Sequence, residues 1–155
     1  SEIGIRDCKR RMKTKELLHK VCEIDAKTRA YTWFDMEVLK YDGYKLTLSG
    51  STDFSYYHRL EIIFEDVFLI KSYMHGWQSD TSQAVFMIPK NEFELNVKYE
   101  IEQGYQLFVF KNEDSHNDII IAAKDVSYSD DIVYYYLRAN LKPNERIADF
   151  VKAKQ

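Results

Sequence analysis

The segment from Phe93 to Ile101 alternates apolar and polar residues without interruption. Strict alternation is the pattern of a β-strand with one buried face and one wet face. A second apolar run, Tyr105 to Phe110, follows after three residues that end in Gly104. A three-residue loop with Gly104 in the left-handed conformation pairs Ile101 with Tyr105 and keeps the apolar residues of both strands on one face. The pattern therefore predicts a β-hairpin over this stretch.

A second hairpin is predicted between Trp33 and Gly50, with its turn around Asp42-Gly43. A three-residue loop that ends at Gly43 pairs Val38 with Leu46 and keeps the apolar residues together. A two-residue turn at Asp42-Gly43 is the alternative, but it sets a charged side chain opposite an apolar one. We therefore prefer the three-residue loop.

The most apolar stretch of the chain runs from Tyr57 to Tyr73. Its first half alternates, whereas every position from Val67 to Ile70 is apolar. No Gly or Pro offers a tight turn at Glu65-Asp66, so a single long strand with a β-bulge at that acidic pair is expected. The loss of alternation predicts a second half that is covered on both faces.

Other runs predict shorter elements. The segment from Thr14 to Arg29 carries apolar residues at three- and four-residue spacing, which predicts a helix. The segment that begins at Pro143 has similar spacing and predicts a second helix near the end of the chain. Further strands are expected at residues 84–88, 119–126 and 132–137.

These elements predict an α+β fold that is mainly antiparallel β. About eight strands arrive in consecutive hairpins rather than alternating with helices, so neighbouring strands should run antiparallel. One helix is expected at the N-terminal end and one at the C-terminal end. A curved sheet, a sandwich and a partly open barrel all fit this order. Residues 1–13 are expected to form a basic N-terminal extension, and residues 14–155 a single domain.

Charge is distributed unevenly along the chain. Residues 1–30 carry nine Lys or Arg against five acids, and residues 31–155 carry thirteen against twenty. Nucleic-acid binding by the main domain is disfavoured, because phosphate contacts need clustered cations. The acidic body instead favours a basic protein partner. The basic run at residues 9–13 is interpreted as a solvated terminus.

Several features bear on the compartment. No apolar run approaches the roughly 18 residues that a membrane-spanning helix needs, so no membrane association is expected. Cys8 and Cys22 are the only cysteines, and two thiols in a charged, helix-like stretch indicate reduced side chains. Together with the absence of an apolar run at the beginning of the sequence, these features predict a cytoplasmic protein. The oligomeric state is left open.

The sequence lacks the short motifs of common enzymes. It contains neither a Gly-rich phosphate-binding loop nor the G-x-S-x-G motif of serine hydrolases. None of the histidines has metal-ligand spacing to another; they are His19, His58, His75 and His116. No cofactor and no metal are therefore expected, and a non-enzymatic role is favoured.

The candidate binding residues are acidic, aromatic or imidazole side chains, namely Glu94, Glu100, Glu102, His75, Trp77 and Tyr135. The three glutamates would form an acidic rim on the wet face of the hairpin predicted at 93–110, which suits a cationic partner. Tyr135 is the middle one of three consecutive tyrosines, and Trp77 lies in a polar loop. Aromatic side chains offer a large contact area at low entropic cost. Core packing is the alternative role for both.

Two hypotheses follow for function. The first is a non-enzymatic protein-binding module with an acidic binding face, such as a bacterial inhibitor or a toxin-immunity protein. The second is a small-ligand-binding β cup with an aromatic-lined cavity and, at most, weak catalytic activity. A filled interior favours the first hypothesis, and a closed aromatic cavity holding His58 or His75 favours the second.

Overall fold

The computed structural model describes residues 2–152, and the side chains of residues 14–151. In chain order, its helices and strands are α1 (Glu2–Arg29), β1 (Phe34–Asp42), β2 (Lys45–Ser51), β3 (Tyr57–His58), β4 (Leu60–Lys71), β5 (Trp77–Ser79), β6 (Phe86–Met87), α2 (Glu92–Lys98), β7 (Gln106–Phe110), β8 (Ile119–Ser129), β9 (Ile132–Tyr134), β10 (Glu145–Ile147) and α3 (Asp149–Lys152).

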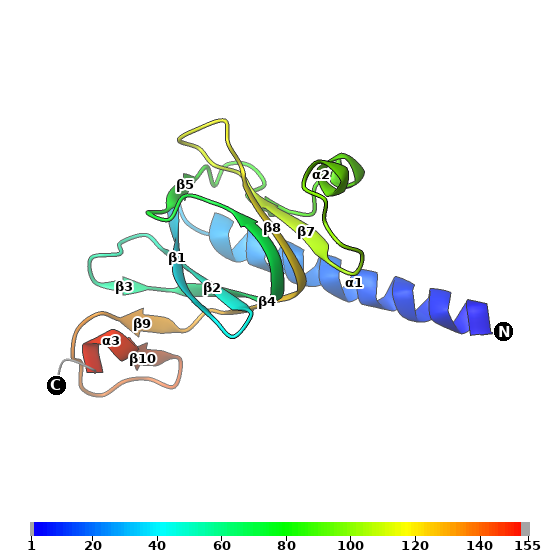
Figure 1. Ribbon diagram of the computed structural model, residues 1–155. Helices are drawn as coiled ribbons and strands as arrows, with labels where there is room; N and C mark the ends of the chain where they lie inside the picture. Colours follow the sequence, from blue (N-terminus) through cyan, green and yellow to red (C-terminus); the bar gives the residue numbers. More distant parts are fainter. Residues whose placement is uncertain (1, 153–155) are drawn as a thin grey trace.

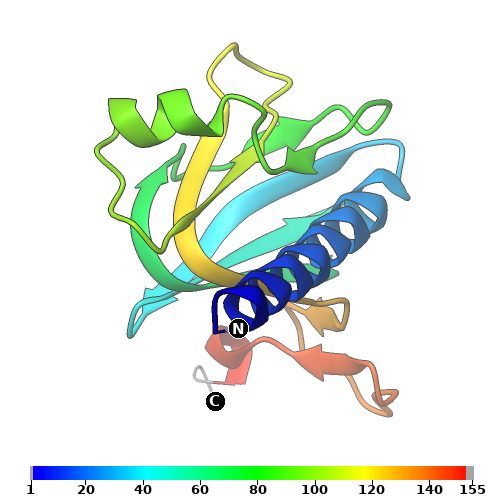
Figure 2. The ribbon, with the colours of Figure 1, turned by 90° about the vertical axis from the view of Figure 1, so that its right-hand side faces the viewer.

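Seven of the strands form one antiparallel sheet in the order β5-β1-β2-β4-β8-β7-β6. The sheet curls into a half-barrel, and α1 lies across its concave side (Figures 1 and 2). A second sheet of three short strands, in the order β10-β9-β3, lies at the opposite end of the molecule from α2. The predicted α+β, mainly antiparallel fold is therefore confirmed, and its form is a curled half-barrel.

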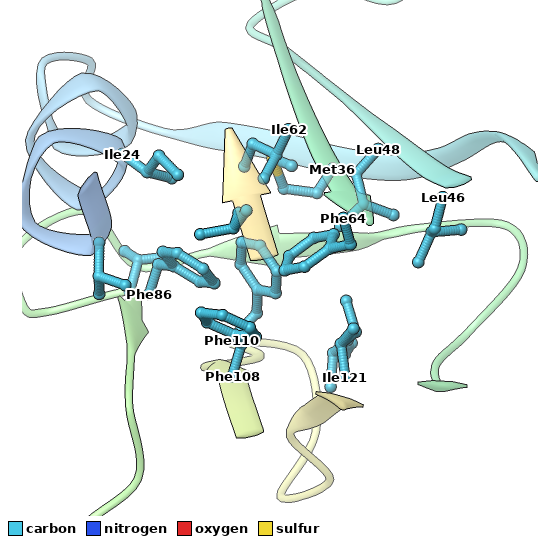
Figure 3. Packing of buried hydrophobic residues seen from close by; sticks show 14 of the residues in the cluster. Ile24, Met36, Leu46, Leu48, Ile62, Phe64, Phe86, Phe108, Phe110 and Ile121 are labelled. Atoms are coloured by element: carbon cyan, nitrogen blue, oxygen red, sulfur yellow. The ribbon is translucent and has the colours of Figure 1, made fainter. Parts of the chain in front are cut away.

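The concave side of the sheet is filled with side chains. Alternate positions of the strands point inward, and four phenylalanines, Phe64, Phe86, Phe108 and Phe110, form the centre of the core (Figure 3). The ring centroids of Phe86 and Phe110 lie 4.5 Å apart, and those of Phe64 and Phe108 lie 5.4 Å apart. Such aromatic pairs add about 0.5–1.5 kcal/mol each beyond the burial of their area. From α1, Ile24 completes the packing and is fully buried.

The hairpin predicted at 93–110 is wrong in its first strand, because most of that segment forms the helix α2. The helix covers an apolar patch on the convex side of β7 and β8, where Leu107 and Ala122 are buried. In a helix, alternating apolar residues fall on two opposite faces. Leu95 therefore packs against the sheet, whereas Phe93 is 80 % exposed. Coverage of the convex side thus outweighs the local strand pattern.

The β1–β2 hairpin forms, but both predicted registers are wrong. The strands are joined by a two-residue turn at Gly43-Tyr44, where both residues have positive φ angles of 54° and 70°. This is the pattern of a type I′ turn, which matches the twist of the strands. A β-bulge between Val38 and Lys40 shifts the register, so Val38 lies opposite Leu48 rather than Leu46.

The long strand predicted at 57–73 is largely confirmed as β3 followed by β4. Asp66 has a positive φ of 52°, and the register with β8 shifts between Val67 and Leu69, two positions beyond the predicted bulge at Glu65-Asp66. The expectation that the second half is covered on both faces is wrong. Phe68 and Ile70 are 37 % and 40 % exposed, because this end of β4 reaches the rim of the sheet.

The end of the chain differs from the predicted helix at Pro143. Residues Glu145–Ile147 form β10, which pairs in parallel with β9, and only Asp149–Lys152 form a helix, α3. The apolar residue Ile147 is buried by strand pairing, opposite Tyr134. At the other end, α1 begins at Glu2, twelve positions before the predicted start. Its buried side chains Val21, Ile24 and Thr28 recur at helical spacing.

Candidate binding pocket

A pocket of about 450 Å³ lies on the convex side of the sheet, beside the edge strand β5. Four segments form its walls: the first half of β1, the loop between β2 and β3, the turn that leads from β4 into β5, and the loop between β7 and β8. Its principal lining residues are Asp35, Glu37, Phe54, Tyr73, His75 and Asp114. The pocket is open to solvent on one side, unlike the filled concave side.

The alternation of β1 positions two carboxylates in this pocket. Phe34 and Met36 point into the core and are buried, so Asp35 and Glu37 point to the convex side. The turn into β5 is held close to β1 by Gly76, which has a φ of +97°. A Cβ atom at this position would lie 2.5 Å from the backbone oxygen of Met36. Only glycine fits this approach without displacement.

Both carboxylates are half-buried, and both have raised pKa values. Burial raises the pKa of Asp35, and the nearby negative charge of Asp114 raises it further. Burial also raises the pKa of Glu37, although His58 opposes this shift. Among the described residues, no hydrogen bond or ion pair stabilises either carboxylate, and no Lys or Arg lines the pocket. The pocket is therefore an acidic site without a lysine or arginine of its own.

The other walls suit an organic cation. Phe54 and Tyr73 provide aromatic surface, and aromatic rings attract ammonium and guanidinium groups through their π-electrons. The hydroxyl of Tyr73 accepts a hydrogen bond from the side-chain amide of Asn117, at 3.1 Å. This bond ties the β7–β8 loop to the opposite wall. A cation in the pocket would thus meet both carboxylates and aromatic rings.

His75 and Trp77, two of the residues selected from the sequence, both line this pocket. His75 is exposed, and its ring lies 6.1 Å from that of Tyr73. Trp77 belongs mainly to the core, since it is 4 % exposed and its ring packs 5.5 Å from Phe110. Its indole nitrogen is buried and has no hydrogen-bond partner among the described residues.

Tyr135 lies elsewhere, in a buried polar cluster between the two sheets. Its hydroxyl lies 2.8 Å from Nδ1 of His58, and Nε2 of the same imidazole lies 3.2 Å from the Glu61 carboxylate. Arg146 also binds Glu61. Burial raises the pKa of Glu61, but the hydrogen bond from His58 and the positive charge of Arg146 outweigh burial and leave the pKa lowered. Burial and the charges of Glu37 and Glu61 raise the pKa of Tyr135.

This polar cluster lies apart from the binding pocket. His58 is 1 % exposed and Glu61 is 8 % exposed, and neither residue lines the binding pocket. The cluster instead connects the second sheet to β4. Its hydrogen bonds satisfy the imidazole and the carboxylate, which is what buried polar groups require.

The acidic residues Glu94, Glu100 and Glu102 lie in a third place, on α2 and the loop that follows it. All three side chains are exposed, and none forms an ion pair with another described residue. They do not meet His75, Trp77 or Tyr135 to form a common site. The six residues selected from the sequence are therefore distributed over three regions.

Sequence reasoning missed Asp35, Glu37 and Asp114, the acids of the pocket. The signal for the first two was present, because they occupy the polar positions of an alternating strand. Their meeting with Asp114 depends on the pairing of β1 with β5 and on the path of the β7–β8 loop. Neither can be read from the sequence alone.

No group of three metal-binding side chains occurs in the part of the chain that the structure describes. Within the same part, no helix has the length and apolar character needed to cross a membrane. Comparison of the chain with protein-family models, curated proteins and solved structures finds no match. Function is therefore inferred from the chemistry of the pocket itself.

Proposed function

We propose that this protein is a non-enzymatic protein-binding module and that its pocket receives a cationic side chain of a basic partner. The observation that carries the proposal is the pair of half-buried carboxylates, Asp35 and Glu37, which form no ion pair and no side-chain hydrogen bond with a described residue. A Lys ammonium or an Arg guanidinium would supply that missing charge.

Desolvation explains why such a pair is expected to bind. Placing a carboxylate in a half-buried site costs free energy unless a hydrogen bond or an opposite charge compensates it. The folded protein bears this cost at both Asp35 and Glu37, and Asp114 adds repulsion. A bound cation removes the repulsion and compensates the desolvation. Part of its affinity therefore comes from removing the unfavourable free energy of the unliganded carboxylates.

The filled concave side favours this proposal over the alternative of a ligand-binding β cup. Phenylalanine rings and α1 occupy the interior that a cup would need for its ligand. The pocket beside β5 is open, which suits a side chain that projects from a protein surface. Free small amines share the same chemistry, so they form the comparison in the test.

The test is titration with short peptides, followed by NMR chemical shifts of the pocket amides. The probes are acetylated and amidated Gly-Gly-Lys-Gly-Gly and its Arg counterpart, with norleucine and citrulline peptides as uncharged controls. We expect only the cationic peptides to shift the amides of Asp35, Glu37 and Gly76. Uncharged peptides that bind equally well would contradict the proposal. Butylammonium that binds as tightly as the peptides would instead assign the pocket to small amines.

Two matched variants make the test specific. The double variant Asp35→Asn/Glu37→Gln should weaken peptide binding about tenfold or more, because it removes both charges that attract the cation. The variant Asp42→Asn removes an exposed carboxylate at the β1–β2 turn, outside the pocket, and should leave binding unchanged. Equal losses in both variants would indicate a diffuse charge effect rather than a site.

A further inference from the structure

The exposed face of α2 carries two apolar side chains one helical turn apart. Phe93 is 80 % exposed and Val97 is 62 % exposed, and their spacing of four residues places them side by side. The opposite face holds Leu95 and Tyr99, which pack on the convex side of the sheet. The exposed pair thus serves no packing role within the described part of the protein.

Exposed glutamates surround this apolar pair. Glu94 lies next to Phe93 in the helix, and Glu100 follows three positions after Val97, where its positive φ of 52° ends the helix. Glu102 lies in the loop beyond. These exposed carboxylates form no ion pair with other described residues, whereas Asp66, Asp118, Asp125 and Asp130 each contact a lysine.

Two of the lysines near α2 are directed elsewhere. Lys71 donates a hydrogen bond to the hydroxyl of Tyr99 at 3.2 Å, and Lys98 lies 5.4 Å from the centroid of the same ring. Both lysines therefore gather around Tyr99, which is on the sheet side of α2. A third lysine, Lys90, precedes the helix and is exposed, so the three exposed glutamates outnumber it and the surface around α2 stays acidic.

We propose that this face of α2 docks a basic amphipathic helix of a partner protein. A partner helix with apolar residues at positions i, i+3, i+4 and i+7 presents a stripe that can cover Phe93 and Val97, and the rim of glutamates matches lysines or arginines that flank such a stripe. The inference builds on the proposed protein-binding function, but it does not depend on the pocket beside β5. Here α2 supplies the apolar anchors, and its acidic rim selects the charge of the partner.

The test uses the full chain and a fluorescein-labelled synthetic helix of leucines and lysines in heptad order. Its control is the same helix with glutamate in place of lysine. Fluorescence anisotropy should show saturable binding of the lysine helix only, with affinity that falls as salt rises. Binding of both helices, or of neither, would overturn the proposal.

Variants locate the binding surface. Phe93→Ser/Val97→Ser should weaken binding about tenfold or more, as loss of central apolar anchors does. The control Tyr44→Ser removes a 70 % exposed aromatic residue at the β1–β2 turn and should leave binding unchanged. A Glu94→Lys/Glu100→Lys variant should lose both affinity and salt dependence. Circular dichroism melting checks that each variant is folded.

Further measurements distinguish other occupants of this face. If the wild-type protein self-associates in sedimentation velocity and Phe93→Ser/Val97→Ser abolishes that association, the face is a contact between copies and the proposal is wrong. Binding to neutral phosphatidylcholine vesicles that requires Phe93 would likewise overturn it. The Asp35→Asn/Glu37→Gln variant should bind the lysine helix normally. If the α2 proposal fails, the pocket proposal is therefore unaffected. If the pocket proposal fails, the α2 proposal is likewise unaffected.

Discussion

The Nε2 atom of His58 lies 3.2 Å from a carboxylate oxygen of Glu61, and both residues are buried where the two sheets meet. His58 belongs to β3 of the small sheet, and Glu61 belongs to β4 of the large one. Tyr135 and Arg146, from the end of the chain, complete the cluster. One carboxylate therefore connects β3 and β10 of the small sheet to the half-barrel, and Tyr135 joins them through His58.

Replacement of Glu61 by glutamine should destabilise the protein by about 2 kcal/mol, because it leaves two buried or half-buried donors without their anion. Urea denaturation monitored by tryptophan fluorescence measures the change. The control is Glu65→Gln on the same strand, where an exposed ion pair with Lys45 is expected to contribute less than about 0.5 kcal/mol. Equal effects from both variants would show that the cluster does not connect the sheets energetically.

The same carboxylate predicts a loss of stability in acid. The folded pKa of Glu61 is lowered, so its contribution is complete above the ordinary glutamate pKa of about 4.3 and is lost as pH falls through the lower folded value. Denaturation curves between pH 7 and 3 should show this decline. In Glu61→Gln the decline should be shallower, and a slope identical to that of the wild type would contradict the assignment.

The two pocket carboxylates should affect stability in the opposite direction as pH falls. The pKa values of Asp35 and Glu37 are raised in the folded state, so their charges oppose folding above those values and cease to do so below the unfolded pKa. Each of Asp35→Asn and Glu37→Gln should therefore stabilise the unliganded protein at pH 7 by about 0.5 kcal/mol, at the expense of binding. The gain should disappear as pH falls toward 4. Destabilisation at pH 7 would indicate that these carboxylates already have partners.

Substitutions at two glycines distinguish the cost of backbone strain from the cost of a steric clash. Gly76 and Gly104 have similar φ angles of +97° and +103°, but an added Cβ meets the Met36 oxygen at 2.5 Å in the first case and no atom within 4 Å in the second. Gly104→Ala should cost about 1 kcal/mol for strain alone. Gly76→Ala should cost about 1–2 kcal/mol more and should weaken cationic peptide binding. Similar melting temperatures for both variants would contradict the close approach.

Much of the fold could be predicted from the sequence because strand alternation is visible wherever one face is buried. The strands near Met36, Leu48, Ile62 and Leu107 were located correctly for this reason. Failures occurred where tertiary contacts decided the outcome. The alternating stretch that begins at Phe93 forms a helix, because in that form it buries the apolar residues on the convex side of β7 and β8.

The candidate sites were less predictable than the fold. The acids of the pocket were visible as polar positions, but the approach of β5 to β1 that encloses them involves residues about 40 positions apart. The polar cluster around Glu61 shows the same limit, since it joins residues 58, 61, 135 and 146. Short-range patterns carry no information on such encounters.

The pairing of β4 with β8 at the centre of the large sheet has a kinetic consequence. It places Glu61 opposite Ser129 and Lys71 opposite Ile120, so the chain must bring distant segments together before the middle of the half-barrel exists. Proteins dominated by such non-local pairings refold in milliseconds to seconds rather than microseconds. The β1–β2 hairpin, with its two-residue turn, can form early on its own. Until β8 pairs with it, β4 presents an unpaired apolar edge. Chains that are still folding are therefore vulnerable to aggregation before this pairing forms.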